Sequence, residues 1–592
     1  MNLSILDLSI VIAFFGITVI IGVLTAKKAG KGFNEYFLSG RDMPWWLLGI
    51  SMVATTFSAD TPNLVTNIVR QNGVAGNWVW WAFLLTGMLT VFVYAKLWRR
   101  SGIDTDLGFY ELRYGGKGAA FLRGFRALYL GIIFNILVLA SVLLAGIKIS
   151  ATMLGMGAVE TVIIVSAITL FYTVLGGLRS VILTDLFQFI IAMVGSIWAA
   201  VYLLNLPEVG GLQSLLQNPE LQDSLRLLPE PGAADAWMAL FIIPLAVQWW
   251  AVWYPGAEPG GGGYIAQRML SAKNERNAVG ATLLFNIAHY GLRPWPWILI
   301  ALASLVVFPD LESLRTAFPH VEESVAQDDM AYPAMLTYLP AGLLGLVLAS
   351  LVAALMSTLS THLNWGASYA VNDFYKRFIK PEASERELVT MGRIFTLFIM
   401  VVAAFIALKL ENALQMFHII VMIGAGTGLI FILRWFWWRI NAAGEIAAMV
   451  ISFVAAITIN LILPEHFAFF DNMPDHYRIL LVVAVTTPGW LIVTLWTPPE
   501  KDEVLLDFVH RVRPHLAGFK KILKRNGVDP ADIPTSSFSK ELTAMFAGVF
   551  VVYAALFGTG FVIYGQWLQA AFAMAVFTVG VAILLRFKKA VF

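Results

Sequence analysis

Four hydroxyl side chains lie within five residues of this sequence, at Ser357, Thr358, Ser360 and Thr361. They interrupt a stretch that is otherwise apolar from Leu343 onward. Hydroxyl and carbonyl oxygens are hard ligands that suit a small hard cation and suit soft metals poorly. In a helix, Ser357, Ser360 and Thr361 share one face. Such hydroxyls also bond back to the carbonyl four residues earlier, so a structural role stays open, but the clustering favours an ion site.

A single carboxylate lies inside a second apolar stretch. Asp185 comes about two turns into the segment that starts at Ser180, after the turn signal Gly176-Gly177. A carboxylate at membrane depth costs free energy, and such groups usually serve ion or proton pathways. We interpret Asp185 as a cation ligand. The alternative is a structural ion pair with Arg179.

Three further ionisable residues could contact a solute: His289, Arg293 and His418. Arg293 lies near the centre of the apolar stretch 278–308, and an ionisable group at that depth predicts a functional site. If the helix starts near Tyr290 instead, Arg293 only extends to the membrane rim. His418 fits a packing histidine equally well.

Two apolar stretches are interrupted where a membrane span should be continuous. Trp45 to Val69 is broken at Thr55–Asn63, and the stretch from Trp237 is broken at Pro255–Gly263. Hydrocarbon does not solvate free peptide groups, so unwound backbone persists there only beside protein, water or a bound ion. Two such breaks in corresponding positions of two halves indicate a transporter binding site. Asp60, beside the first break, either touches the solute or caps the restarted helix.

The composition indicates a membrane protein. The chain has 592 residues, 59% hydrophobic and 13% charged, with a mean hydropathy of +0.75. Continuous apolar runs exclude a transmembrane barrel, and the absence of cysteine excludes disulfides and thiolate sites. The net charge of +2 gives no indication of a nucleic-acid partner. The first run, Ser4 to Ala26, lacks the flanks of a signal peptide and predicts a retained span.

The sequence predicts an all-α polytopic protein with about fifteen spans. They lie near 4–26, 45–69, 78–98, 127–154, 158–176, 180–204, 236–258, 278–308, 340–370, 391–410, 413–434, 443–463, 479–496, 543–564 and 567–586. Basic residues, Arg268 among them, gather in alternate connections, and basic connections stay cytoplasmic. We therefore expect a plasma (inner) membrane protein with its N-terminus outside and its C-terminus inside.

The one long polar insert, 497–542, carries a basic stretch from Phe508 to Arg525. We expect a solvated or interfacial cytoplasmic helix, with a regulatory domain as the alternative. The chain holds no phosphate loop, zinc motif, nucleophile elbow or dinucleotide fingerprint, so no enzyme is expected.

Several segments together resemble the sodium/solute symporter family, which includes bacterial galactose, sialic-acid and proline carriers. The resemblance runs from about Phe33 to Glu445, and the segments that carry it are Tyr264–Glu275, Gly176–Gln188, Ala354–Thr361 and Arg434–Ala442. It implies a five-plus-five inverted-repeat (LeuT-like) core with extra N- and C-terminal spans, and sodium-driven alternating access. The implied parts are 1–44 (extra span and loop), 45–204 and 236–440 (the two repeats), 441–496 (two further spans), 497–542 (insert) and 543–592 (C-terminal spans).

Site residues follow from the same resemblance. The main sodium site would use carbonyls of Ala54 and Phe57 with Ala354, Ser357 and Thr358. A second site, present in some members, matches Asp185, Ser360 and Thr361, so one or two sodium ions per cycle are expected. The solute positions match Thr61, Trp81 within the Trp78–Trp81 run, His289 and His418, with Asp60 and Arg293 nearby. Because these residues differ from those of the sugar carriers, sugar specificity does not carry over.

The main hypothesis is a sodium-coupled symporter that imports a small polar solute, with a sugar or polyol slightly favoured. The partners expected are sodium, the solute and the lipid bilayer, with the monomer as the functional unit. An amino acid or carboxylate is the alternative solute. A transporter-like solute sensor is the alternative of another class, and a passive channel is disfavoured by the broken helices.

Overall fold

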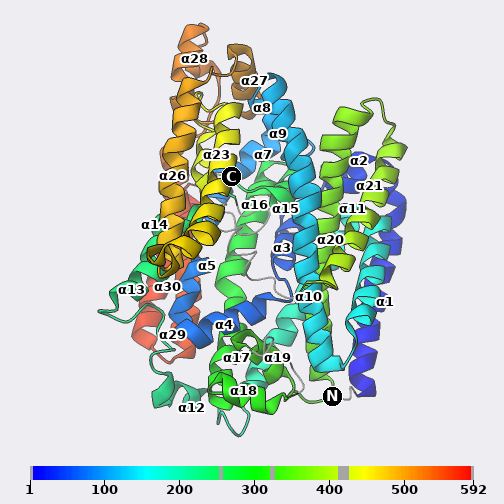
Figure 1. Ribbon diagram of the computed structural model, residues 1–592, viewed down its shortest axis with the longest axis vertical. Helices are drawn as coiled ribbons and strands as arrows, with labels where there is room; N and C mark the ends of the chain where they lie inside the picture. Colours follow the sequence, from blue (N-terminus) through cyan, green and yellow to red (C-terminus); the bar gives the residue numbers. More distant parts are fainter. Residues whose placement is uncertain (1–3, 252–257, 320–326, 411–423, 425, 588–592) are drawn as a thin grey trace.

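The computed structural model describes residues 4–251, 258–319, 327–410, 424 and 426–587 (Figure 1). Over these residues the regular secondary structure is helical, apart from one isolated parallel bridge between Met43 and Ala272. Helices predominate because a helix satisfies its own peptide groups where no water is present.

The first half of the chain supplies the following α-helices: α1 Ile5–Ala29, α2 Phe33–Leu38, α3 Trp45–Thr55, α4 Thr61–Asn72, α5 Trp78–Trp81, α6 Leu84–Leu89, α7 Ala95–Ser101, α8 Gly108–Arg113, α9 Gly116–Leu128, α10 Asn135–Leu154, α11 Ala158–Leu204, α12 Leu212–Gln217, α13 Ala234–Trp237, α14 Ile243–Ala246, α15 Gly263–Ser271 and α16 Glu275–Asn286.

The second half supplies α17 Pro294–Val307, α18 Leu311–Ala317, α19 Ala331–Leu336, α20 Leu343–Ser368, α21 Glu385–Ala407, α23 Ala442–Ile457, α24 Leu463–His466, α25 Ala468–Asp471, α26 Asp475–Trp496, α27 Asp502–Val512, α28 Lys520–Arg525, α29 Phe538–Ile563 and α30 Trp567–Arg586. Short π-helical turns continue several of them, including η8 Ile287–Leu292 between α16 and α17.

Eleven helical stretches in the described part of the chain are long and apolar enough to cross a membrane. One of them, α11, has 47 residues and corresponds to two predicted spans. At about 1.5 Å per residue it is more than twice as long as the hydrocarbon core is thick. Gly177 breaks it at φ 55°, a conformation that suits glycine. The other predicted spans are the two broken ones and 413–434, most of which lies outside the described residues.

The helices form two groups around a central set (Figure 1). On the right of Figure 1, α1, α11, α20, α10 and α21 stand side by side, and contacts link α11 to α20, α1 to α11, and α10 to α21. On the left, α23 packs on α26, and α29 packs on α30. The short helices α3, α4, α15 and α16 lie between the two groups.

The molecule has two chemically different ends. We call the end with α2, α8 and α27, at the top of Figure 1, the basic end, because it holds basic connections such as Lys27-Lys28 and Arg99-Arg100. We call the end with α12 and α18 the acidic end, and α1 begins there. The placement of connections by charge agrees with the alternation that the sequence predicted.

The helix that carries the hydroxyl cluster is enclosed along almost its whole length. From Leu343 to Ser368 only two side chains of α20 are more than marginally exposed. Its N-terminus is fixed by Asp7 of α1, whose Oδ1 accepts hydrogen bonds from the N–H groups of Gly342 and Gly345, both at 2.7 Å. A carboxylate at a helix N-terminus satisfies free N–H groups and complements the helix dipole.

The insert differs from the solvated helix that the sequence predicted. The basic stretch does not form one helix, because α27 ends at Val512 and Arg513 adopts a left-handed conformation before the short α28. Phe508 and Phe519 are fully buried, and the Arg113 guanidinium lies over both rings at 5.5 and 5.8 Å. The insert is therefore docked on the basic end.

Candidate functional site

The first broken helix is present as the sequence predicted. α3 ends at Thr55 and α4 begins at Thr61, so five residues lie between two helix ends in the middle of the bundle. The N–H of Phe57 bonds to the carbonyls of Val53 and Ala54 at 3.0 and 3.1 Å. The last carbonyls of a helix have no partner further along the same helix, which makes the end of α3 a source of oxygen ligands.

The second broken helix restarts at α15, after a run of glycines. Gly260, Gly261 and Gly263 have φ values of 90°, 77° and 50°, which only glycine adopts readily. Residues 252–257 of this break lie outside the described part of the chain. At the restart the Gly263 N–H donates to Asp106 Oδ2 at 2.9 Å, and the Gly260 carbonyl accepts from Trp98.

The hydroxyl cluster on α20 meets the end of α3 directly. Thr358 Oγ1 donates to the Thr55 carbonyl at 3.1 Å and to the Ala354 carbonyl at 3.2 Å. Thr361 Oγ1 lies 3.0 Å from Thr55 Oγ1. Ala54, Phe57, Ala354, Ser357 and Thr358 all have buried side chains. Hydroxyl and carbonyl oxygens from two elements thus converge at one buried place.

Asp185 lies beside this cluster and accepts hydrogen bonds from both α20 and α3. Ser357 Oγ donates to Asp185 Oδ1 at 2.6 Å, and Ser51 of α3 donates to Oδ2. The expected alternative pairing with Arg179 is wrong, because Arg179 lies 3.5 Å from Asp42 instead. The partner of Asp185 is Arg268, whose NH2 is 3.7 Å from Oδ2, and both side chains are fully buried.

The assignment of Arg268 to a basic connection is also wrong. Arg268 lies within α15, its side chain is buried, and it donates to Thr361 Oγ1 at 2.8 Å and to Ser51 Oγ at 3.2 Å. The third member of the predicted second site, Ser360, donates to the Ser357 carbonyl of its own helix at 3.1 Å. Two of the three predicted ligands of a second sodium therefore contact Arg268.

His289 and Arg293 meet the break of the first helix. His289 Nδ1 is 3.0 Å from Thr56 Oγ1, and Arg293 NH1 donates to the same oxygen at 3.3 Å. η8 ends at Leu292 and α17 begins at Pro294, with Arg293 between them. Arg293 is 2% exposed, so its side chain is enclosed by protein. Its guanidinium stacks over Trp297 at 5.4 Å, and Trp297 packs on Phe57.

An aromatic path leads from His289 to Trp81. The His289 ring is 5.9 Å from Trp80, and Trp80 is 6.0 Å from Trp81. Trp81 is fully buried, and its indole Nε1 has no hydrogen-bond partner among the described residues. On α4, the buried Oδ1 atom of Asn63 also lacks a hydrogen-bond partner among the described residues. Buried polar atoms normally have partners, so each such atom needs an explanation.

Of the three remaining predicted solute residues, the structure describes two. Thr61 is the first residue of α4, and Asp60 precedes it with an exposed side chain that makes no capping bond. Of its two predicted roles, capping is therefore absent. His418 lies outside the described residues.

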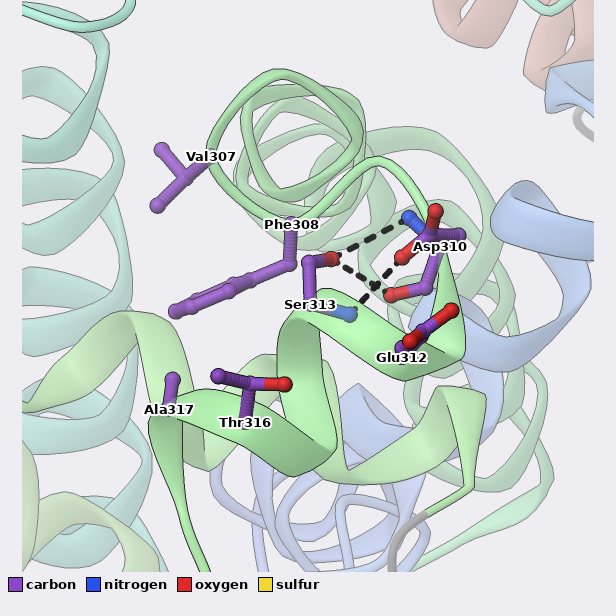
Figure 2. A pocket seen from close by; sticks show the side chains of 7 residues that line it. All are labelled: Val307, Phe308, Asp310, Glu312, Ser313, Thr316 and Ala317. Atoms are coloured by element: carbon purple, nitrogen blue, oxygen red, sulfur yellow. Dashed lines mark hydrogen bonds between the residues drawn. The ribbon is translucent and has the colours of Figure 1, made fainter.

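A surface hollow elsewhere contributes nothing to this site (Figure 2). Its volume is about 520 Å³, and Val307, Phe308, Glu312 and Thr316 are among the residues that line it. As Figure 2 shows, Asp310 and Ser313 are committed to each other as a helix cap, with Ser313 N–H donating to Asp310 Oδ1 at 2.8 Å. None of the predicted site residues lines this hollow.

Comparison with known proteins identifies the family. The family model for the sodium:solute symporter family matches residues 36–452. This chain belongs to the sodium:solute symporter family. It is a multi-pass membrane transporter rather than an enzyme, and sodium is the ion that the family couples to solute movement.

Two relatives share low sequence identity with this chain but align with most of it. A sodium/glucose cotransporter of Vibrio parahaemolyticus is 26% identical over 512 residues, which cover 82% of this chain and 90% of the relative. A sodium/myo-inositol cotransporter 2 of Oryctolagus cuniculus is 26% identical over 546 residues, or 84% and 78% of the two chains.

A solved structure confirms the fold. A Na⁺-coupled sialic acid symporter in a substrate-bound outward-open state superposes with a TM-score of 0.65 at 17% identity, covering 84% of this chain and 100% of that one. The symporter is thus an all-α protein with the inverted-repeat (LeuT-like) core that the family resemblance implied.

Proposed function

We propose that this symporter couples inward sodium flow to the uptake of a small polyhydroxylated solute, a sugar or polyol, by alternating access. The sodium ion binds where α3 ends against α20, with oxygen ligands from Ala54, Phe57, Ala354, Ser357 and Thr358. The observation that carries this proposal is the hydrogen bond from Thr358 Oγ1 to the Thr55 carbonyl. It supports a buried site where hydroxyls and helix-end carbonyls meet, which suits a small hard cation.

The solute position is proposed between the first break and the aromatic path. Thr61, Asp60, Trp81, His289, Arg293 and His418 are the proposed contacts. Two features support a polar solute with ring-like faces: the Trp81 Nε1, which has no hydrogen-bond partner among the described residues, and the aromatic rings beside it. The named solutes of the relatives, glucose and myo-inositol, support the same class.

An amino acid or carboxylate is the second candidate, because Arg293 lies within hydrogen-bond distance of Thr56 at the break. A guanidinium binds a carboxylate with two parallel hydrogen bonds. Uptake by reconstituted proteoliposomes decides between the two classes. Under a sodium gradient we expect accumulation of a labelled sugar or polyol, competed by its own class and not by amino acids or sugar acids. Competition by carboxylates alone would contradict the proposal, and binding without accumulation would favour the sensor.

A second sodium position at Asp185, Ser360 and Thr361 is also proposed. Arg268 contacts two of these residues, so a second ion would share the Asp185 carboxylate with the guanidinium. If this position is used, Asp185→Asn lowers the sodium-to-solute ratio, which a shift in reversal potential reports. An unaltered reversal potential would leave one sodium per cycle.

We propose that the basic end faces the cytoplasm and that the N-terminus lies outside, in a plasma (inner) membrane. The support is the clustering of Lys and Arg connections at that end, since basic connections are retained inside. A tag on the N-terminus should be accessible in intact cells.

A further inference from the structure

The two broken helices each have a half on the basic side, and these halves are joined to each other. α3 begins at Trp45 and α15 ends at Ser271, next to the single bridge of the described structure. There the Met43 N–H donates to the Ser271 carbonyl at 3.3 Å, and the Lys273 N–H donates to the Met43 carbonyl at 3.1 Å. Because main-chain bonds connect their ends, α3 and α15 form one unit, which we call the inner pair.

The inner pair is held to α11 and α20 by one buried charge pair. Arg268 belongs to the inner pair and Asp185 belongs to α11, and both side chains have no exposed surface. Ser51 of α3 donates to Asp185 and accepts from Arg268, so it bridges the two charges. Thr361 of α20 accepts from Arg268 at 2.8 Å. Four elements therefore meet at a single guanidinium.

Neighbouring contacts extend this connection toward the basic end. Gln267, next to Arg268, donates from Nε2 to Asn364 Oδ1 of α20 at 2.9 Å and to the Phe37 carbonyl of α2 at 3.0 Å. Its Oε1 accepts from Arg268 NH1 at 3.1 Å, which orients the guanidinium. Separating the inner pair from α11 and α20 breaks three contacts together. They are the contacts of Ser51 and Arg268 with Asp185, the bond from Arg268 to Thr361, and the bond from Gln267 to Asn364.

The chemistry of the pair makes it suitable for a two-state contact. A buried charge is tolerated only while it is paired and hydrogen-bonded. A guanidinium offers five donors in a fixed plane, so it satisfies several acceptors in one position and few of them after a small displacement. The contact therefore favours a fully closed arrangement over a partly open one.

We propose that Arg268 is a positioning residue that latches the inner pair onto α11 and α20 and so keeps the basic side of the symporter closed until transport requires it to open. This latch rests on the alternating access of the proposed function. It adds the specific bonds that must break for the basic side to open.

The natural absence of cysteine allows a direct test, because a single introduced cysteine is labelled without background. Ser368 suits this purpose. It lies four residues after Asn364 and seven after Thr361, on the face of α20 that meets the inner pair, and it is buried. The experiment measures the rate at which a water-soluble maleimide labels Ser368→Cys in purified full-length protein without sodium or solute.

We expect slow labelling in the Ser368→Cys background alone and labelling faster by about tenfold or more when Arg268→Gln or Asp185→Asn is added, as for a shift of a two-state population. Arg70→Gln is the matched control. Arg70 is also a buried arginine, paired with Asp328 on the acidic side, and its loss should leave labelling of Ser368→Cys unchanged. Labelling is compared only among variants that elute as a single folded species.

If Arg268→Gln gives no folded protein, Ser51→Ala carries the test, since it removes only the hydroxyl bridge between the charges. We then expect labelling faster by roughly threefold, within the worth of one hydrogen bond to a charged group. Labelling of folded Arg268→Gln, or of Ser51→Ala in its place, at the background rate would overturn the latch. Because no sodium or solute is present, a wrong solute assignment would not change this result.

Discussion

Two buried arginines at opposite ends of the broken helices hold them in different ways. Arg268, on the basic side, lies 3.7 Å from Asp185 and is also bridged to it by the Ser51 hydroxyl, and neither charged side chain is exposed. Arg70, on α4 toward the acidic end, contacts Asp328 at 2.8 Å and also the main-chain carbonyls of Ser304 and Phe308. Asp328 is 17% exposed. The basic-side contact is made by side chains, whereas the acidic-side contact also uses two main-chain carbonyls.

On this comparison, loss of the Asp185 carboxylate should have the largest effect on folding free energy. Asp185→Ala leaves the Arg268 charge buried without its partner, which typically costs roughly 3–5 kcal/mol of folding free energy. Asp328→Ala should cost clearly less, because Arg70 keeps two carbonyl acceptors and water reaches the vacated position. Thermal unfolding of the two purified variants measures the difference. Equal losses would show that the two ends are held alike.

The break between the two contacts should affect solute binding rather than folding. Thr56→Val removes the hydroxyl that His289 and Arg293 share. A hydrogen bond to a charged group is worth about 1.5–3 kcal/mol, so we expect the KM for solute to rise by about tenfold or more. At saturating solute, the variant should take up solute at a rate similar to that of the wild type, with an unchanged sodium requirement. A change confined to the sodium requirement would place the solute elsewhere.

A pH effect should be specific to the basic side. Burial raises the pKa of Asp106 to about 7, aided by nearby Glu258, although hydrogen bonds from Tyr369 and the Gly263 N–H oppose the rise. The folded chain therefore binds this proton more tightly than the unfolded chain, so stability falls as the pH rises from 3.8 to about 7 and is level above. Unfolding temperature against pH measures this. Asp106→Asn should flatten that part of the profile, and an unchanged slope would refute the assignment.

The smallest effect is expected at the surface of the basic end. Lys28 and Asp42 lie 3.2 Å apart with 38% and 47% of their side chains exposed. Exposed pairs contribute about 0–1 kcal/mol, so Asp42→Asn should unfold within a few degrees of the wild type. A loss as large as that of Asp185→Ala would mean that surface charge, not the buried pair, secures this end.

Much of this site could be predicted from residue types at unusual depth. The breaks at Thr55–Asn63 and before Gly263, the hydroxyls of α20 and the carboxylate of Asp185 are all polar groups where hydrocarbon would otherwise be expected. Arg268 could not be placed in the same way, since it comes shortly before the basic pair Lys273 and Arg276 and so has the pattern of a connection.

Contacts between distant segments could not be predicted from the sequence either. Asp7 lies in the first turn of an exposed helix, yet it caps α20 more than 330 positions later in the chain. Phe508 and Phe519 lie in a basic stretch that predicts solvent exposure, and only their burial against Arg113 shows that the insert docks. In each case the pairing depends on tertiary packing, for which local pattern gives no signal.

The most direct test of the account is the sodium dependence of solute uptake by Thr358→Val in proteoliposomes. Valine keeps the shape of threonine and removes the oxygen that contacts the end of α3. We predict that the sodium concentration for half-maximal uptake rises by about tenfold or more, the worth of one oxygen contact to a charged group, while the protein stays folded. A folded variant with the wild-type sodium dependence would contradict a sodium ion bound between α3 and α20.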